Sequence, residues 1–230
     1  MGEASEHHPS VLRNRGPIRD QLLTMLPSTP FQALEVASGS AGQLEVFAEA
    51  FPHGTWQPSE YIPPQAKEGP GADLQTQVMT ETYGSDALTR IDRLGGSQKF
   101  KNVLPAIALD ASLPFEQWPV ADKAGWYDLV YASNVFHISD WAVGQGLLLG
   151  AARCLKPGGL FVTYGAFKMG GDFGTQSNAD FDANLRQRNP TWGVRDVDHL
   201  KEVAAPAGLE LVDRRDMPAN NHLLQFVKKG

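Results

Sequence analysis

The chain has 230 residues, of which 20 are Lys or Arg and 26 are Asp or Glu, so its net charge is −6. This acidic balance argues against a nucleic-acid partner, because phosphate contacts need grouped Lys and Arg side chains. The longest stretch without these charged residues, 21–34, contains two prolines and is too short to span a membrane. Hydrophobic residues make up 42% of the chain, which is enough to form a folded core.

The sequence also indicates a compartment and excludes some kinds of site. The acidic N-terminus has no apolar run behind it and does not resemble a secretory signal. The single cysteine, Cys154, excludes a disulfide framework and a multi-cysteine metal site. The scattered histidines do not share metal-ligand spacing. We therefore expect a cytoplasmic protein without a bound metal or a membrane partner.

Short apolar runs alternate with helical patterns, which is typical of a parallel sheet covered by helices on both faces. We expect strands at residues 33–37, 54–60, 103–110, 127–132, 160–164, 209–213 and 223–227. We expect helices at residues 18–26, 41–50, 87–94, 141–155, 179–188 and 197–207. The pattern predicts one α/β domain over residues 1–230, with a terminal antiparallel hairpin and a loop insertion near residues 62–83.

The segment after the first predicted strand is the most informative one. Glu35 stands near the strand end, and the small residues Ala37, Ser38 and Gly39 lead through a turn to the next helix. Small side chains let a ligand lie against the backbone. In an open parallel sheet, such a turn opens onto the crevice where ligands bind. An ordinary loop between a strand and a helix would have the same composition.

Two more acids stand at the ends of the next two predicted strands. Glu60 is placed to accept both ribose hydroxyl protons, and Asp110 is placed to accept from an adenine amino group. Each acid alone is typical of a solvated loop, but acids at the ends of three consecutive strands favour one common ligand. An acid beside the turn suits a cationic ligand such as S-adenosylmethionine better than a pyrophosphate. The turn also lacks the glycine spacing of a nicotinamide-dependent oxidoreductase, which is the weaker rival.

With these residues, the chain resembles a class I S-adenosylmethionine-dependent methyltransferase and, more narrowly, the methyltransferase-like 26 family (domain of unknown function 938). The matching segments are residues 13–18, 34–40, 56–60, 102–105, 109–110, 134–138, 155–159, 164–165, 176–196 and 217–221. The resemblance implies a Rossmann-like fold, with a seven-stranded, mostly parallel sheet, helices on both faces and a C-terminal antiparallel hairpin. It also implies methyl transfer from S-adenosylmethionine.

The resemblance further implies which residues form the site. Cofactor-binding residues would be Arg15, Glu35, Ala37, Ser38, Gly39, Glu60, Asp110, Ala111 and Asn134, with residues 1–30 folding over the cofactor. Substrate-binding residues would be Asn178, Trp192, Arg195 and Asn220. The guanidinium of Arg195 would grip a carboxylate with its planar fork. We expect a small polar acceptor, because no basic groove and no second domain are evident; an O, N or S acceptor atom stays open.

The candidate catalytic residues are His137 and Tyr164. His137 lies three residues beyond Asn134, on the segment that leaves the fourth strand, and would act as the general base. The alternative is a histidine that caps the next helix. The Tyr164 hydroxyl would bind substrate, or it belongs to a core tyrosine.

The chain departs from the family at its cofactor turn. The family continues the turn with Gly-Gln-His, whereas this chain has Ala41, Gly42 and Gln43. An additional methyl group at Ala41 could crowd the cofactor. The alternative function is therefore a catalytically weak S-adenosylmethionine-binding sensor or partner protein.

Overall fold

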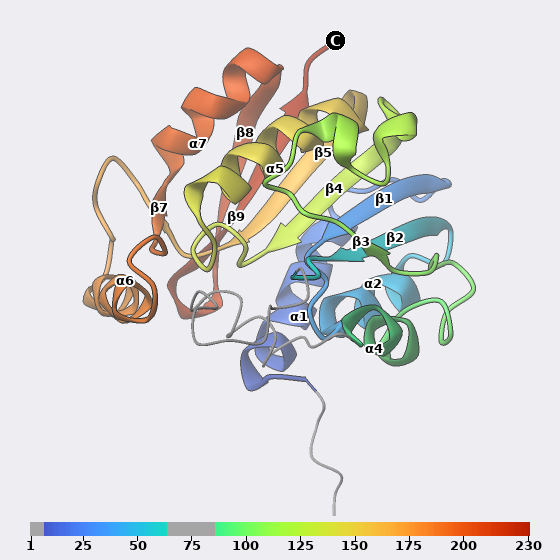
Figure 1. Cartoon of the computed structure of the whole chain (residues 1–230), viewed down its shortest axis with the longest axis horizontal. Coiled ribbons are helices and arrows are strands. Elements are labelled where there is room, and N and C mark those ends of the chain that lie inside the picture. The colour runs from blue at the N-terminus through green and yellow to red at the C-terminus, as the bar shows by residue number, and fades with distance from the viewer. Residues whose placement is uncertain (1–6, 64–85) are drawn as a thin grey trace, which may run out of the picture.

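The computed structural model of the protein describes residues 7–63 and 86–230. Seven strands form one sheet in the order β3-β2-β1-β4-β5-β9-β8 (Figure 1). Strands β1 to β5 pair in parallel, β9 runs antiparallel to β5, and β8 and β9 form an antiparallel hairpin. This arrangement confirms the predicted Rossmann-like α/β fold with its C-terminal hairpin.

The bounds of the elements agree closely with the predicted ones in most places. The strands of the large sheet are β1 Phe31–Val36, β2 Gly54–Glu60, β3 Ile107–Ala108, β4 Tyr127–Ser133, β5 Leu155–Gly165, β8 Leu209–Met217 and β9 Asn221–Lys228. The helices are α1 Pro9–Leu23, α2 Gly42–Ala50, α4 Ala87–Leu94, α5 Trp141–Cys154, α6 Gln176–Arg188 and α7 Val197–Ala204. Short 3-10 helices are η1 Phe115–Gln117, η2 Ala121–Lys123, η3 Ala205–Ala207 and η4 Pro218–Asn220.

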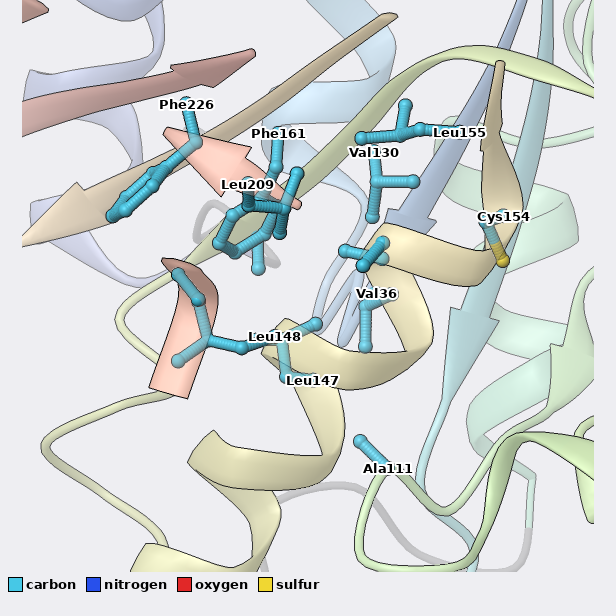
Figure 2. Close-up of a cluster of buried hydrophobic side chains, with 14 of the residues drawn as sticks. Val36, Ala111, Val130, Leu147, Leu148, Cys154, Leu155, Phe161, Leu209 and Phe226 are labelled. Atoms are coloured by element: carbon cyan, nitrogen blue, oxygen red, sulfur yellow. The ribbon is translucent and has the colours of Figure 1, made fainter. Parts of the chain in front are cut away.

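Two hydrophobic clusters hold the helices against the two faces of the sheet. Helices α5 and α7 cover one face, and α1, α2 and α4 cover the other (Figure 1). Figure 2 shows part of the first cluster, in which Leu147 and Leu148 of α5 gather with Val36 and Val130 of the sheet. A sheet buried on both faces explains why its central strands read as nearly continuous apolar runs.

The N-terminal helix is longer than predicted, because Pro17 lies inside it rather than before it. Proline has no backbone N–H, so the carbonyl of Arg13 loses its usual partner in the helix. Burial compensates for this loss, since Ile18 and Leu22 are fully buried against the sheet. The helix begins at Pro9, where the His8 side chain accepts a hydrogen bond from the Ser10 backbone N–H.

The third strand is shorter than predicted. Only Ile107 and Ala108 pair with β2, while Val103 forms an isolated bridge to Trp56. Pro105 lies between these two places and cannot donate to a sheet ladder, which explains the interruption. The fifth strand, by contrast, starts at Leu155 and includes an irregularity before Leu160.

A small second sheet was not predicted. It consists of β6 (Phe167–Lys168) and β7 (Arg195–Asp196), which pair in parallel on either side of α6 in the chain. Strands of two residues leave no periodic pattern in a sequence.

The predicted insertion near residues 62–83 falls almost wholly outside the described residues. Within residues 7–63 and 86–230, no helix is long and apolar enough to cross a membrane.

Candidate active site

The turn after β1 has an unusual backbone. Ala37, Gly39 and Ala41 have φ angles of 61°, 59° and 59°, all in the left-handed region. This conformation costs an alanine about 1–2 kcal/mol, and strained residues of this kind cluster at functional sites. The backbone N–H of Ser38 donates to the Ser59 carbonyl at 2.9 Å, so the turn is fixed to the end of β2.

Glu60 ties this turn to β2 through its side chain. Its Oε2 accepts a 2.7 Å hydrogen bond from the Gly39 N–H, and its Oε1 accepts a 2.9 Å bond from the Tyr61 N–H. Burial raises the pKa of Glu60 to about 7, although both N–H groups and the charge of Arg90 lower it. Glu60 is therefore a buried carboxyl group held in place against the turn.

Glu35 lies on β1 directly beside Tyr131 of β4. Its side chain is buried, and its Oε2 has no hydrogen-bond partner among the residues that the structure describes. Burial raises the pKa of Glu35 to about 7; the Ser38 hydroxyl lowers it, and the charge of Glu60 raises it. The structure thus brings the acids of the first two strands close enough to interact.

Two tyrosines lie on the same face of the sheet as Glu35. Tyr131 and Tyr164 are both fully or almost fully buried, and neither hydroxyl finds a partner within the described ranges. Burial and the nearby Glu35 raise the pKa of Tyr131, and burial raises that of Tyr164 to about 12, opposed by Arg13. Tyr131 was not predicted, because a tyrosine inside a buried strand reads as core, and its apolar neighbour Leu129 on the same face gives the same indication.

Asp110 and Ala111 follow β3, at the same edge of the sheet as the ends of β1 and β2. Asp110 Oδ1 accepts from the Ser112 N–H at 2.8 Å and from the Ser112 hydroxyl at 2.6 Å. Ala111 is buried, and its carbonyl approaches Gly146 of α5 so closely that a Cβ there would lie 1.8 Å from the oxygen. The loop that carries Asp110 is therefore packed directly onto α5.

Asn134 and His137 lie on the segment that leaves β4. Asn134 has a φ of 62°, and its N–H donates to the Tyr164 carbonyl at 2.8 Å. His137 is buried against Gly165 and the ring of Phe181, whose centroid lies 5.2 Å from that of the imidazole. Its Nδ1 has no partner in the described part of the chain. Burial and then the charge of Arg195 lower the pKa of His137 to about 4, so the imidazole is neutral at physiological pH.

Three predicted substrate residues lie around α6 and the β8–β9 turn. Asn178 of α6 donates through Nδ2 to the Asn220 carbonyl at 3.1 Å and to the Phe173 carbonyl at 3.3 Å. Asn220 and its neighbour Ala219 have φ angles of 57° and 60°. Trp192 is buried, and its indole Nε1 has no partner among residues 7–63 and 86–230. The structure therefore brings Asn178 and Asn220 together.

Arg195 is engaged by backbone carbonyl groups. Its Nε donates to the Phe136 carbonyl at 3.0 Å, and its Nη2 donates to the carbonyls of Ser139 and Thr191 at 2.8 and 2.7 Å. The guanidinium also lies 5.8 Å from the centre of the Trp141 ring. Most of the fork that was expected to grip a carboxylate is thus used inside the protein.

The predicted cofactor residue Arg15 is likewise engaged. It donates to Glu45 of α2 at 2.7 Å, and Glu45 also pairs with Lys99. The N-terminal segment reaches the turn through other residues: the His7 ring lies 3.0 Å from the Ser40 hydroxyl, and Val11 packs on Gly42.

The methyl group of Ala41 is fully buried in the hydrophobic cluster of α1, α2 and α4, where it faces Gly95. Among the described residues, no group of three or more His, Cys, Asp and Glu side chains is placed to hold a metal ion.

A family model described as "Protein of unknown function (DUF938)" matches residues 5–228. The chain belongs to the DUF938 family. Its fold is also that of solved methyltransferases. An O-methyltransferase family protein from Burkholderia thailandensis matches with a TM-score of 0.67 and 16% identity, over 94% of this chain and 56% of its own.

Two further structures share the fold of this DUF938 protein. An O-methyltransferase family 2 protein from Planctomyces limnophilus, solved with apigenin, has a TM-score of 0.66 and 16% identity over 95% of this chain and 58% of its own. A methyltransferase of calicheamicin biosynthesis, in its SAH-bound form, has a TM-score of 0.62 and 13% identity, over 88% of this chain and 50% of its own. The chain thus spans between 50% and 58% of the length of these proteins.

The site of the DUF938 protein combines two kinds of group. Buried acids lie beside a strained turn at the ends of β1 and β2, and a neutral histidine lies on the segment after β4. Carboxylates can bind hydroxyl, amino or cationic groups of a ligand, and a neutral imidazole can accept a proton. The acids therefore suit a polar or cationic ligand, and the histidine suits a proton transfer.

Proposed function

We propose that this protein is an S-adenosylmethionine-dependent methyltransferase that acts on a small polar molecule, and that residues 1–230 work as one domain. The observation that carries the proposal is the hydrogen bond from the Gly39 N–H to Glu60, beside the unpartnered oxygens of Glu35 and Tyr131. A buried polar atom without a partner costs about 1–3 kcal/mol. A polar ligand that reaches these atoms would explain why the chain keeps them.

The residues present fit the adenosyl cofactor. A carboxylate has about four acceptor positions, and the Gly39 and Tyr61 N–H groups occupy two of those of Glu60. The others can accept the two ribose hydroxyls. Asp110 binds Ser112 through Oδ1, so its Oδ2 can accept from the adenine amino group.

The cationic end of the cofactor would be held near β1. We assign this role to Glu35, with Ala37, Ser38, Gly39, Ala111 and Asn134 forming the surrounding backbone. The turn and its acid lie at the carboxyl edge of the sheet, where open parallel sheets bind their ligands. Since Arg15 is paired with Glu45, we propose that it holds α1 on α2 instead of binding the cofactor's carboxylate itself.

When bound, S-adenosylmethionine would supply a methyl group that its sulfonium already activates. The residues of the chain would orient the acceptor and exclude water, which can contribute about 7–11 kcal/mol to catalysis. His137 would take up the proton of the acceptor. With a pKa of about 4 it is a weak base. An acceptor that has gained a methyl group carries a far more acidic proton, so a weak base is sufficient.

The acceptor would be bound on the side of α6. Asn178 and Asn220 lie together there, and Trp192 has an unpartnered indole N–H. The Tyr164 hydroxyl, also unpartnered, is a further candidate. Since Arg195 is engaged by carbonyl groups, we do not assign it a direct contact with an acceptor carboxylate. We also propose that the protein is related to the methyltransferase-like 26 family, which the sequence of segment 176–196 supports.

The function is tested by calorimetry followed by product detection. We expect the protein to bind S-adenosylmethionine but not a nicotinamide cofactor. With a library of small polar metabolites, we expect S-adenosylhomocysteine to form with at least one acceptor. Binding without product for any acceptor would favour a sensor, and a chain that ignores S-adenosylmethionine would contradict the proposal.

A further inference from the structure

Arg195 connects two loops that meet beside His137. One loop is residues 134–140, which leaves β4 and carries the histidine; the other is residues 189–194, which follows α6. The guanidinium donates to the carbonyls of Phe136 and Ser139 in the first loop and to that of Thr191 in the second. One planar group thus fixes the backbone on both sides of His137.

The second loop also contacts the histidine directly. The Gly193 N–H donates to the His137 carbonyl at 3.1 Å. Gly193 has a φ of 146°, and a Cβ there would lie 2.7 Å from Asp182 and 2.6 Å from Arg186. Asp182 in turn accepts a 2.7 Å bond from the Val194 N–H. The loop that supports His137 is therefore held at several points and has little freedom to move.

We propose that Arg195 is a positioning residue, whose guanidinium holds the loop of His137 so that the imidazole stays buried and aimed at the acceptor. A lysine could not replace it, because an ammonium is a point charge and cannot donate to three separated carbonyls in one plane. The effect of this positioning on catalysis rests on the proposed function. The contacts of Arg195 with the two loops do not depend on it, so the positioning role and the proposed function can be disproved separately.

The charges around His137 matter for the test. The charge of Arg195 acts on the imidazole, and Arg195 is itself acted on by the charges of Arg186, Asp140 and Asp182. Burial, the larger cause, and the positive charge both lower the pKa of His137. Arg195→Lys keeps the charge and removes the fork, whereas Arg195→Met removes both. The lysine variant therefore separates positioning from charge.

The test follows the His137 ring proton by NMR across about pH 5 to 8, where an ordinary histidine titrates, in protein without cofactor. His137→Gln assigns the signal. The matched control is Arg153→Met, because Arg153 also lies over an aromatic ring, that of Phe115, but its ion pair is with the exposed carboxylate of Glu116. In the wild type and the control, we expect His137 not to titrate in this range. In Arg195→Lys and Arg195→Met, we expect its pKa to rise from about 4 toward the ordinary 6.5.

A wild-type titration of His137 in the folded lysine variant would overturn the proposal, since the fork would then be dispensable. Failure of both Arg195 variants to fold would also overturn it, because the residue would then serve global stability. Once an acceptor is known, a second measurement applies: Arg195→Lys should lower kcat about tenfold or more with little change in the affinity for S-adenosylmethionine.

Discussion

The carboxylate of Glu60 accepts a 2.7 Å hydrogen bond from the backbone N–H of Gly39, across the gap between the ends of β2 and β1. Through this contact, the acid at the end of β2 holds the turn that follows β1. In the proposed function, the same carboxylate also binds the ribose, so one side chain contacts both the turn and the ligand.

The first prediction concerns this side chain. Glu60→Gln replaces one acceptor oxygen by an amide NH₂, which cannot accept from the Gly39 or Tyr61 N–H. We expect the affinity for S-adenosylmethionine to fall about tenfold to a hundredfold, which corresponds to the loss of about one hydrogen bond to a charged group. Calorimetry measures it, with Glu210→Gln, an exposed acid paired with Lys229, as the control. Equal affinities in both variants would count against the ribose contact.

The second prediction concerns the pH dependence of stability. The folded-state pKa of Glu35 is raised from 4.5 to about 7. The folded state therefore binds this proton more tightly than the unfolded state, and the stability that it contributes below pH 4.5 is lost as the pH rises to about 7. The depressed pKa of His137 acts in the opposite direction, because its contribution is lost as the pH falls from 6.5 to about 4.

Glu35→Gln isolates the contribution of Glu35, because those of Glu60, whose pKa is also raised to about 7, and of His137 remain in the variant. Between about pH 5 and pH 7.5, we expect the wild type to lose more free energy of unfolding than the variant, by about 2 kcal/mol. Denaturant unfolding at both pH values measures the difference. If the free energy of unfolding depended on pH in the same way in both proteins, Glu35 would not be a buried carboxyl group with a raised pKa.

The third prediction uses two tyrosines of one strand. Tyr127 and Tyr131 lie toward opposite ends of β4, and both have buried hydroxyls without a partner among the described residues. Replacing either by Phe removes an unsatisfied group, so we expect the free energy of unfolding to stay equal or rise slightly. Only Tyr131→Phe should weaken the binding of S-adenosylmethionine, because only Tyr131 lies beside Glu35. Equal binding by the two variants would exclude Tyr131 from the site.

The fourth prediction compares two helical glycines. A Cβ at Gly146 would meet the Ala111 carbonyl at 1.8 Å, whereas a Cβ at Gly16 of α1 has no heavy atom within 4 Å in the described structure. Gly146→Ala should therefore cost about 1–3 kcal/mol or more through overpacking and move the Asp110 loop, which weakens cofactor binding. Gly16→Ala should change the free energy of unfolding much less, because the gain in helix propensity is opposed by the steric conflict between a Cβ at this position and the ring of Pro17. Unfolding midpoints and calorimetry test both changes, and a neutral Gly146→Ala would contradict the observed packing.

The fifth prediction concerns catalysis by His137. His137→Ala should lower turnover by about 10²–10⁴-fold while leaving the affinity for S-adenosylmethionine unchanged. In the wild type, protonation of this residue should reduce the rate only near pH 4, because its pKa is lowered to about that value. Turnover as a function of pH, by product formation, measures both. Unchanged turnover in the alanine variant would leave His137 a structural residue.

Local patterns in the sequence were sufficient to predict most of the fold. The predicted bounds of β2 and α4 are those observed, since glycine, proline and charge mark both ends of these elements. Pro17 was misleading because the burial of Ile18 and Leu22, a tertiary effect, keeps the helix intact around it.

The site could be predicted only in part. Acids at strand ends are visible in a sequence, and the structure places Glu35 and Glu60 together. The partners of Arg195 were not visible. They are backbone carbonyls, up to 59 residues away, and a carbonyl group has no sequence signature. Tyr131 was missed for a related reason, because burial beside an acid depends on the pairing of β1 with β4.

The central claim is that the acids of neighbouring strands bind one adenosyl-sulfonium ligand, and a crystal structure of the protein grown with S-adenosylhomocysteine tests it most directly. The account predicts the ribose hydroxyls on Glu60, the adenine beside Asp110 and the amino-acid end next to Glu35 and the Gly39 turn. A ligand bound on another surface, or crystals that contain none at saturating concentration, would contradict it.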